Sequence, residues 1–252
     1  MSIPDALPSD VVSWTGEVWR LVEGQHRVVT LSLTDSLDDQ ALLEEEIEEV
    51  KPLLPPECAG LHPLLAAPFR YVSYPEGSRF RRANQREGVF YAAERVTTAV
   101  AEMAFYRFLF LAESPGTSPP AGPAEYSAFS VQCHTDLCVD LTTGRLASHA
   151  DIWRAKNDYS LCQEFADRVR AREFEAIRYR SVRDPEAGCN LALLNARSFA
   201  DQEPRSLQTW HLFIRGALIQ AWCEWPKMQR EYHLDDFAGD PRLETLKSNG
   251  AR

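Results

Sequence analysis

The sequence predicts an α+β fold, because strand-like and helix-like segments follow one another without the regular alternation of a βαβ protein. Strand-like runs succeed one another near the end of the chain, and helical segments are spaced irregularly among the earlier strands. The chain has 252 residues, of which 44% are hydrophobic and 25% charged, as in ordinary globular proteins. We therefore expect a single domain over residues 1–252, with its core at about 17–225.

The N-terminal part is expected to add a helical extension at about residues 36–69. A helical segment at 36–54 follows strand-like runs at 17–24 and 26–33, and Ser36 and Asp39 have capping-box spacing. Its apolar stripe is Leu43, Ile47, Val50 and Leu54. Its run of glutamates is interpreted as a solvated face, with a partner-binding face as the alternative. The proline-rich stretch that follows predicts a bent connection or broken helix.

The central part is expected to pair a strand at 88–93 with an almost wholly apolar helix at 97–110, followed by a loop at 113–123. Further strands are expected at 125–133, 137–141, 176–182, 189–195, 209–216 and 218–225, with an amphipathic helix at 159–175. Residues 226–252 are polar and predict a tail that frays.

Charge and motifs exclude several classes of protein. The formal net charge of -10 and pI near 5.1 argue against a protein that binds the nucleic acid backbone directly. No apolar stretch reaches the ~18 residues of a membrane span, and no signal peptide is evident, so a cytoplasmic protein is expected. The absence of Gly-rich phosphate loops, GxSxG and HExxH disfavours nucleotide-fold enzymes, serine hydrolases and zinc proteases.

The six cysteines contain no CxxC pair and are expected to be reduced and mostly buried. Cys133, His134 and Cys138 form the densest group of soft ligands, but a second ligand pair at zinc spacing is missing. Core packing is the favoured interpretation, and no metal is expected.

Glu102 is unusual, because it lies in the middle of the apolar helix at 97–110. Its neighbours on the same side of that helix are Ala99, Phe105, Tyr106 and Leu109. We expect its carboxylate to point into apolar surroundings. It either pairs with an arginine to fix the fold or serves the function.

Basic residues crowd the loop before the strand at 88–93. Arg79, Arg81, Arg82 and Arg86 offer forked donors that suit phosphate oxygens. A solvated loop that pairs with the acidic helix is an equally good interpretation. Ser181, which follows a strand, has arginines on both sides and would otherwise be taken for a turn residue.

Together the segments "GSRFRR", "GVFYAAERVTTAVAE" and "IRYRSVRDPEAGCNLALL" resemble the RES-domain toxins of bacterial RES-Xre toxin–antitoxin systems. The family is named for an arginine, a glutamate and a serine. The motif matches Glu102 to the glutamate and Ser181 to the serine. Arg79 fits the arginine best, and Arg81 is the alternative. Weaker matches are Tyr91, at the end of the arginine loop, and Arg20 in "VWRLVEG".

The resemblance implies an ADP-ribosyltransferase-like core that consumes NAD+ without a metal, and inhibition by a cognate Xre-family antitoxin. Glu102 would hold the ribose 2-hydroxyl and stabilise the positive charge that develops as the nicotinamide–ribose bond breaks. Ser181 would position the ribose or the amide. Arg79, Arg81 and Arg20 would clamp the diphosphate, and Tyr91 would stack on nicotinamide.

The acceptor of ADP-ribose is left open by the sequence. Transfer to a host protein is slightly favoured, and water or phosphate as acceptor, giving an NAD+ glycohydrolase or phosphorylase, is the first alternative. The alternative from another class is a non-catalytic protein that binds a nucleotide or a partner.

Overall fold

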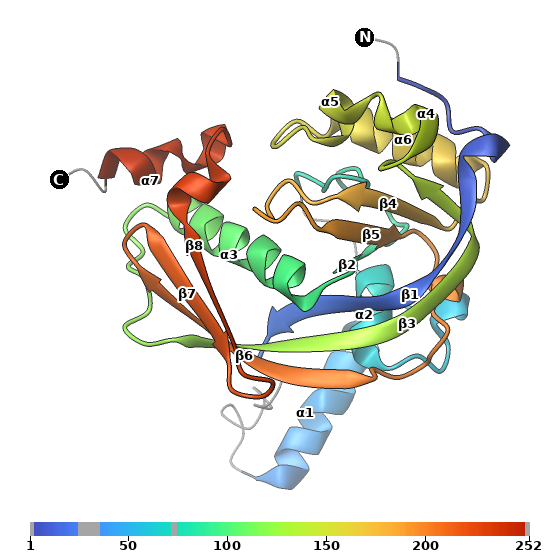
Figure 1. Cartoon of the computed structure of the whole chain (residues 1–252). Helices are drawn as coiled ribbons and strands as arrows, with labels where there is room; N and C mark the ends of the chain where they lie inside the picture. Colours follow the sequence, from blue (N-terminus) through green and yellow to red (C-terminus); the bar gives the residue numbers. More distant parts are fainter. Residues whose placement is uncertain (1–2, 25–35, 72–74, 250–252) are drawn as a thin grey trace.

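The computed structural model describes residues 3–24, 36–71 and 75–249 and confirms the α+β class (Figure 1). In this part of the chain the strands form one eight-stranded mixed sheet in the order β1-β2-β5-β4-β3-β6-β7-β8. The strands are β1 (Val11–Glu23), β2 (Phe90–Ala93), β3 (Ala124–Asp140), β4 (Ala176–Arg180), β5 (Cys189–Leu193), β6 (Ser206–Arg215), β7 (Leu218–Cys223) and β8 (Met228–His233).

The sheet closes on itself through its first strand, because β1 pairs with β3 as well as with β2. The strands β1, β2, β5, β4 and β3 therefore form a ring, and β6, β7 and β8 extend from β3. The pair β3–β4 is parallel, and the other pairs among the described strands are antiparallel.

Helices cover the sheet in three places. Helix α3 packs on β1, β3 and the strands β6 to β8, whereas α5 and α6 cover the outer face of β4 and β5 (Figure 1). Helix α2 packs on a third cluster. The helices are α1 (Leu37–Val50), α2 (Pro63–Arg70), α3 (Val96–Glu113), α4 (Gly144–Ala147), α5 (Ala150–Trp153), α6 (Ser160–Ala171) and α7 (Glu244–Asn249). Short 3₁₀ helices lie at Pro8–Asp10, Pro56–Cys58, Ala196–Ser198, Leu234–Phe237 and Pro241–Leu243.

Helix α3 forms because a long apolar run without glycine or proline can bury nearly its whole surface. Val100, Ala104, Phe105 and Phe108 are fully buried. Burial of each phenylalanine stabilises the fold by about 1.5–3 kcal/mol, so the helix is a fixed platform for the carboxylate that it carries.

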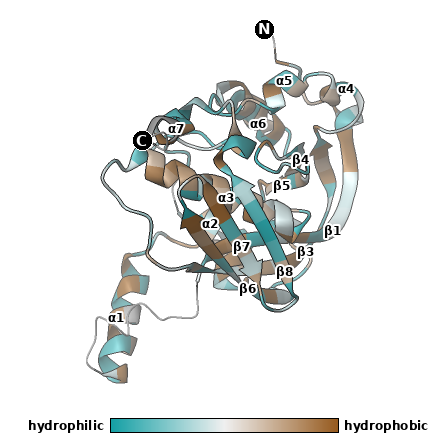
Figure 2. Cartoon of the chain, turned by 60° about the vertical axis from the view of Figure 1, so that its left-hand side comes forward, coloured by the Kyte–Doolittle hydropathy of each residue, from teal (hydrophilic) through white to brown (hydrophobic). Residues whose placement is uncertain are grey.

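Helix α1 begins as predicted, since the backbone N–H of Asp39 donates to Oγ of Ser36 at 3.0 Å. The predicted apolar stripe does not pack on the body, because the side chain of Val50 is 81% exposed. Figures 1 and 2 both show α1 standing away from the rest of the chain. The bent connection after it is confirmed by the short helix Pro56–Cys58 followed by α2.

Two predictions about the strands need correction. The separate strands at 125–133 and 137–141 are one strand, β3, because the polar side chains between them alternate: His134 and Asp136 are exposed, whereas Thr135 is buried and donates to Glu175. The predicted strand at 26–33 lies outside the described residues.

The prediction that residues 226–252 fray is wrong for the described part of that segment. It forms β8, two 3₁₀ helices and α7, and it buries Tyr232, Leu234, Phe237 and Leu243 against the α3 core. Polar residues dominate because only alternate positions of β8 face the core.

Candidate functional site

Glu102 lies where α3, the loop after β4 and strand β5 meet. Oγ of Ser181 and Nδ2 of Asn190 each donate a hydrogen bond to its Oε1 at 2.7 Å. Its Oε2 accepts none from the described residues and is not sealed from solvent. The prediction of wholly apolar surroundings is therefore corrected. The carboxylate is half-buried, with one oxygen fixed by protein donors and the other open.

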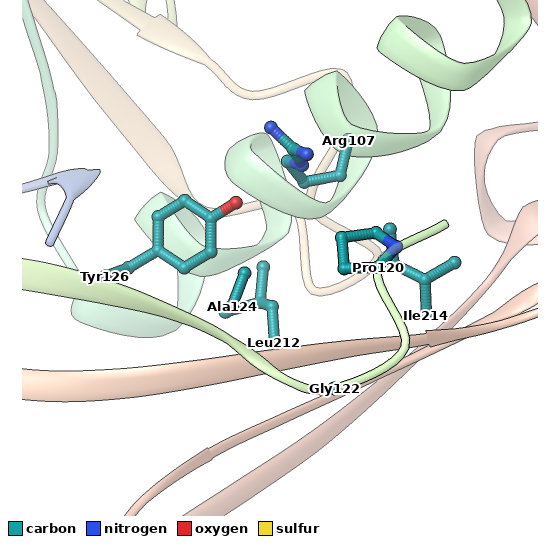
Figure 3. Close-up of a pocket in the computed structure, with 7 residues that line it drawn as sticks. All are labelled: Arg107, Pro120, Gly122, Ala124, Tyr126, Leu212 and Ile214. Atoms are coloured by element: carbon teal, nitrogen blue, oxygen red, sulfur yellow. The ribbon is translucent and has the colours of Figure 1, made fainter. Parts of the chain in front are cut away.

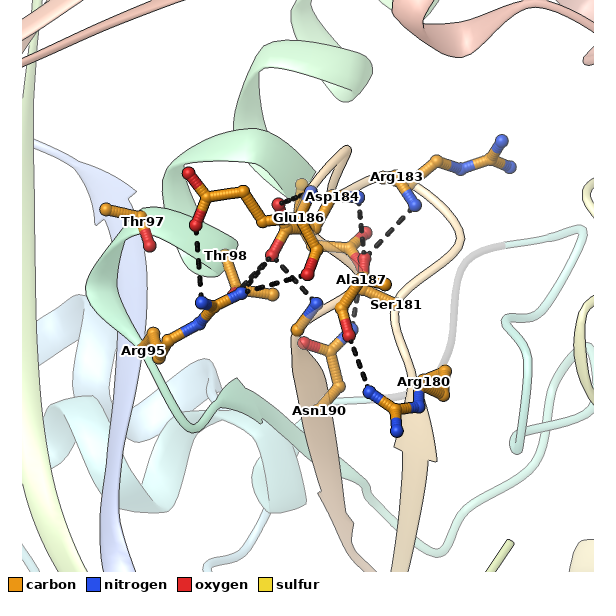
Figure 4. Close-up of polar contacts among 12 residues, drawn as sticks. Arg95, Thr97, Thr98, Arg180, Ser181, Arg183, Asp184, Glu186, Ala187 and Asn190 are labelled. Atoms are coloured by element: carbon orange, nitrogen blue, oxygen red, sulfur yellow. Dashed lines mark hydrogen bonds and ion pairs between the residues drawn. The ribbon is translucent and has the colours of Figure 1, made fainter. Parts of the chain in front are cut away.

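The hydroxyl of Ser181 is oriented by its own loop (Figure 4). Its Oγ accepts from the backbone N–H groups of Arg183 at 3.1 Å and Asp184 at 3.0 Å. Because these donors occupy the acceptor positions of the hydroxyl, its proton is directed to Glu102.

Asp184 fastens this loop to the first turns of α3. Its Oδ2 accepts from Oγ1 of Thr98 at 2.7 Å and from the N–H of Gly188 at 3.0 Å, and it pairs with Arg95 at 3.1 Å (Figure 4). A Cβ on Gly188 would lie 2.1 Å from Oγ1 of Thr98, so this close approach requires glycine. The geometry between Ser181 and Glu102 is thus fixed from both sides.

Arg79 packs against aromatic side chains of the α5–α6 loop and of β4. Its guanidinium lies over the rings of Tyr159 at 4.8 Å and Tyr179 at 5.8 Å and donates to the carbonyl of Trp153 at 2.6 Å. Burial lowers its pKa, but electrostatic interactions with groups that include Tyr159 and Glu102 raise the pKa above its usual value. Arg79 is therefore a permanent positive charge within electrostatic reach of Glu102.

The side chain of Arg81 is hydrogen-bonded to the backbone of its own region. Its Nη2 donates to the carbonyls of Tyr71 at 2.6 Å, Gln85 at 3.1 Å and Arg86 at 3.3 Å. Of the two candidates for the family arginine, Arg79 is the one whose charge interacts with that of Glu102.

Tyr91 supports the same loop, whereas Arg20 lies elsewhere. The hydroxyl of Tyr91 accepts from the backbone N–H of Phe80 and shares a hydrogen bond with Ser78, both at 2.9 Å. Arg20 donates to the carbonyl of Tyr91 at 2.8 Å. It sits on the face of β1 opposite Leu21, which packs against α3, so the structure does not bring Arg20 to Glu102.

Asn190, Arg183 and Asp240 were missed by sequence reasoning. Asn190 is 4% exposed, and its Oδ1 has no partner among the described residues. The sequence signal for Asn190 is that it is a polar residue within the apolar run of β5. The guanidinium of Arg183 lies 3.6 Å from the ring centroid of Phe105 and 2.7 Å from Oδ2 of Asp240, both ions being buried. No local sequence pattern predicts that Arg183 and Asp240 form an ion pair.

Two pockets in the described part of the chain lie away from Glu102, which lines neither of them. One, between α3 and the strands β3 and β6, has room for about one water molecule, with a volume of about 10 Å³ (Figure 3). The other, beside β1, has a volume of about 550 Å³.

The cysteines are free and buried, as predicted. Burial raises the pKa of Cys133 and that of Cys138 to about 12, so both thiols are protonated at neutral pH and are poor metal ligands. His134 shares a hydrogen bond with Thr15 at 2.7 Å. Within residues 3–24, 36–71 and 75–249, no group of three or more histidine, cysteine or acidic side chains is placed to hold a metal ion. No helix in these ranges is long and apolar enough to cross a bilayer.

A family model for the RES domain matches residues 55–215, which is more than half of the chain and includes Glu102, Ser181, Asn190 and Arg79. The chain therefore belongs to the RES domain family. Among solved structures it is similar to the crystal structure of the M. tuberculosis MbcT–MbcA toxin–antitoxin complex, with a TM-score of 0.44 and 15% identity, over 78% of this chain and 85% of that chain. No curated protein matches the chain.

Proposed function

We propose that this protein is an NAD+-consuming toxin that cleaves the nicotinamide–ribose bond and transfers ADP-ribose to a host protein. The observation that carries the proposal is that protein donors hold one oxygen of the Glu102 carboxylate and leave the other open. Ser181 and Asn190 hold Oε1, so Oε2 can accept the ribose 2-hydroxyl without reorganising. That hydrogen bond strengthens as the ribose becomes cationic, so it stabilises the transition state more than the ground state.

We propose roles for two further residues. Arg79 supplies a fixed positive charge for the diphosphate, and the ring of Tyr91, anchored through its hydroxyl, is proposed to face nicotinamide. Arg81 is left out of the clamp because one of its nitrogens is shared by three backbone carbonyls. Arg20 is left out because it lies over Phe90, in the cluster that α2 covers.

A protein acceptor is favoured by α1. It stands away from the body, and Val50 at its end and Leu53 just beyond it are 81% and 93% exposed, which is apolar surface of the kind that contacts other proteins. We further propose that a cognate Xre-family antitoxin inhibits the protein. Co-expression with the neighbouring reading frame should relieve growth arrest if that frame encodes the antitoxin.

The function is tested by incubating the purified chain with labelled NAD+ in buffer, in phosphate and with cell lysate. Nicotinamide release with a labelled protein band supports transfer to protein, whereas free ADP-ribose or its 1-phosphate identifies water or phosphate as acceptor. No release under any condition, from folded protein freed of inhibitor, would favour a binding protein instead.

Ser181→Ala is expected to slow nicotinamide release about tenfold. The substitution removes one of two donors to Glu102 and leaves the N–H groups of Arg183 and Asp184 without their acceptor, which costs about 1–3 kcal/mol of stability. Initial rates and thermal unfolding measure the two effects. An unchanged rate would show that Ser181 does not orient the carboxylate.

Arg79→Lys and Arg81→Lys are expected to separate binding from loop stability. Lysine keeps the positive charge but lacks the paired N–H donors of a guanidinium, so Arg79→Lys should raise KM for NAD+ about tenfold. Arg81→Lys should lower Tm and leave KM of the folded protein unchanged, because Arg81 bonds only carbonyls of its own region. Equal effects on KM would contradict the assignment of Arg79 over Arg81.

A further inference from the structure

A cleft of about 550 Å³ lies beside the first half of β1 and has no role in the proposed chemistry. It is lined by residues 12–17 and by Glu94, Asp140 and Arg178. In β4, Arg178 and Tyr179 are neighbours and point to opposite faces, and Tyr179 faces Arg79. The cleft is therefore on the face of β4 opposite Arg79, away from Glu102.

The edge of β1 that borders this cleft is unpaired among the described strands. β1 pairs with β3 from Val11 to Glu23, but its other edge meets β2 only at Trp19, opposite Ala93. Among the described strands, residues 11–18 therefore have no backbone partner on that edge. Such an edge is a template for an added strand, and proteins usually shield it. An added strand would continue the line of β2 beyond Ala93.

The floor of the cleft is aromatic. A Cβ on Gly16 would lie 2.9 Å from Cη2 of Trp14, so the indole lies across Gly16 and depends on the missing side chain. An apolar side chain of an added strand would find the ring of Trp14 there, while its backbone pairs with β1.

The wall of the cleft is acidic. Arg178 pairs with Glu94 at 2.5 Å and with Asp140 at 3.1 Å, and Glu17 is exposed. The two carboxylates that pair with Arg178 leave a net negative charge on this wall. Glu17, whose side chain is on the face of β1 opposite Trp14, adds an exposed negative charge at the rim, and both charges favour lysine or arginine side chains in whatever binds. A second copy of this chain is disfavoured, since each copy carries a formal charge of -10.

We propose that this cleft binds an extended, basic peptide segment of a protein partner, which adds to β1 as a further strand. Its backbone pairs with residues 11–18. On the face of β1 that carries Trp14, its side chains contact the indole and approach Glu94 and Asp140, and on the other face a basic side chain approaches Glu17. The proposal does not depend on NAD+ chemistry.

The test starts from a displayed library of random nine-residue peptides selected on the full-length protein. We expect enriched peptides that combine lysine or arginine with apolar residues. A synthetic enriched peptide should slow amide hydrogen exchange in residues 11–18 of the full-length chain, because strand addition protects the free edge. No enrichment over an unrelated acidic protein, or protection confined to other segments, would overturn the proposal.

Glu17→Lys should weaken binding of that peptide about fivefold at low salt, since it reverses an exposed charge at the cleft. The matched control is Glu224→Lys, an exposed glutamate in the turn between β7 and β8, which should bind as the unchanged chain does. Gly16→Val, which displaces the indole of Trp14, is the second variant. Equal affinity for all three variants would place the peptide elsewhere and contradict the proposal.

Discussion

Glu102→Gln is expected to lower the rate of nicotinamide release from NAD+ by at least about a hundredfold while the fold persists. Glutamine retains an oxygen that can accept from Ser181 and Asn190, so both hydrogen bonds to that position can survive. What is lost is the negative charge next to the developing ribose cation. Because that charge acts mainly in the transition state, kcat should fall far more than KM rises.

The measurement is the initial rate of nicotinamide release by chromatography, with thermal unfolding of each variant as the test of folding. The matched control is Glu113→Gln, which removes an exposed carboxylate at the end of the same helix and should leave the rate unchanged. If Glu102→Gln keeps more than about a tenth of the rate, the carboxylate is not the stabilising group and the proposed mechanism is wrong.

The same pair of proteins separates an enzyme from a binding protein. A protein that only recognises a nucleotide should bind NAD+ and never release nicotinamide, with or without Glu102. An enzyme of the proposed kind should lose turnover in Glu102→Gln and still bind NAD+, since Arg79 remains in place. Calorimetric titration of the variant with NAD+ therefore complements the rate measurement.

The sequence could predict α3, the strand before it and the identities of Glu102 and Ser181, because those signals are local. An unbroken apolar run predicts a buried helix, and a carboxylate within it stands out without knowledge of its partners. The partners themselves come from far along the chain: Ser181 lies 79 residues from Glu102 and Asn190 lies 88 residues away. Only the sheet topology decides that they meet.

The predictions that failed also depended on contacts between distant parts of the chain. The face of β1 on which Arg20 lies follows from the register between β1 and β3, which no local pattern reveals. The sequence of β8 resembles a polar tail because only alternate residues pack on the core, and Tyr232 is the buried one. Arg81 donates to three backbone carbonyls, whereas Arg79 lies over two tyrosine rings, and neither environment could be predicted from the sequence of the loop.

The C-terminal segment holds the serine loop from outside the residues that match the RES model. Asp240 is 3% exposed and lies between two arginines: its Oδ2 is 2.7 Å from Arg183 and 2.8 Å from Arg242. Arg183 also donates to the carbonyl of Lys156. Because Arg183 is two residues beyond Ser181, Asp240 is placed to steady the turn that aims the serine hydroxyl at Glu102.

Asp240→Ala is expected to destabilise the protein by about 3–5 kcal/mol, since it leaves the buried charge of Arg183 without its partner. For a chain of this size each kcal/mol corresponds to roughly 2–4 °C in Tm. Denaturant unfolding measures the loss. Glu244→Ala, an exposed carboxylate four residues further on, is the control and should change stability by less than about 0.5 kcal/mol.

The pH dependence separates lost charge from lost packing. Burial raises the pKa of Asp240, but its contacts with Arg242 and Arg183 lower it more, so the pKa in the folded protein is below the usual 3.8. A carboxyl with a depressed pKa stabilises the fold above its unfolded pKa and loses that contribution as pH falls through the folded value. The stability gap between the unchanged chain and Asp240→Asn should therefore be full at pH 7 and shrink below pH 3.8. A gap that is the same at all pH values would mean that Asp240 acts through packing, and the ion pair with Arg183 would then not be what steadies the serine loop.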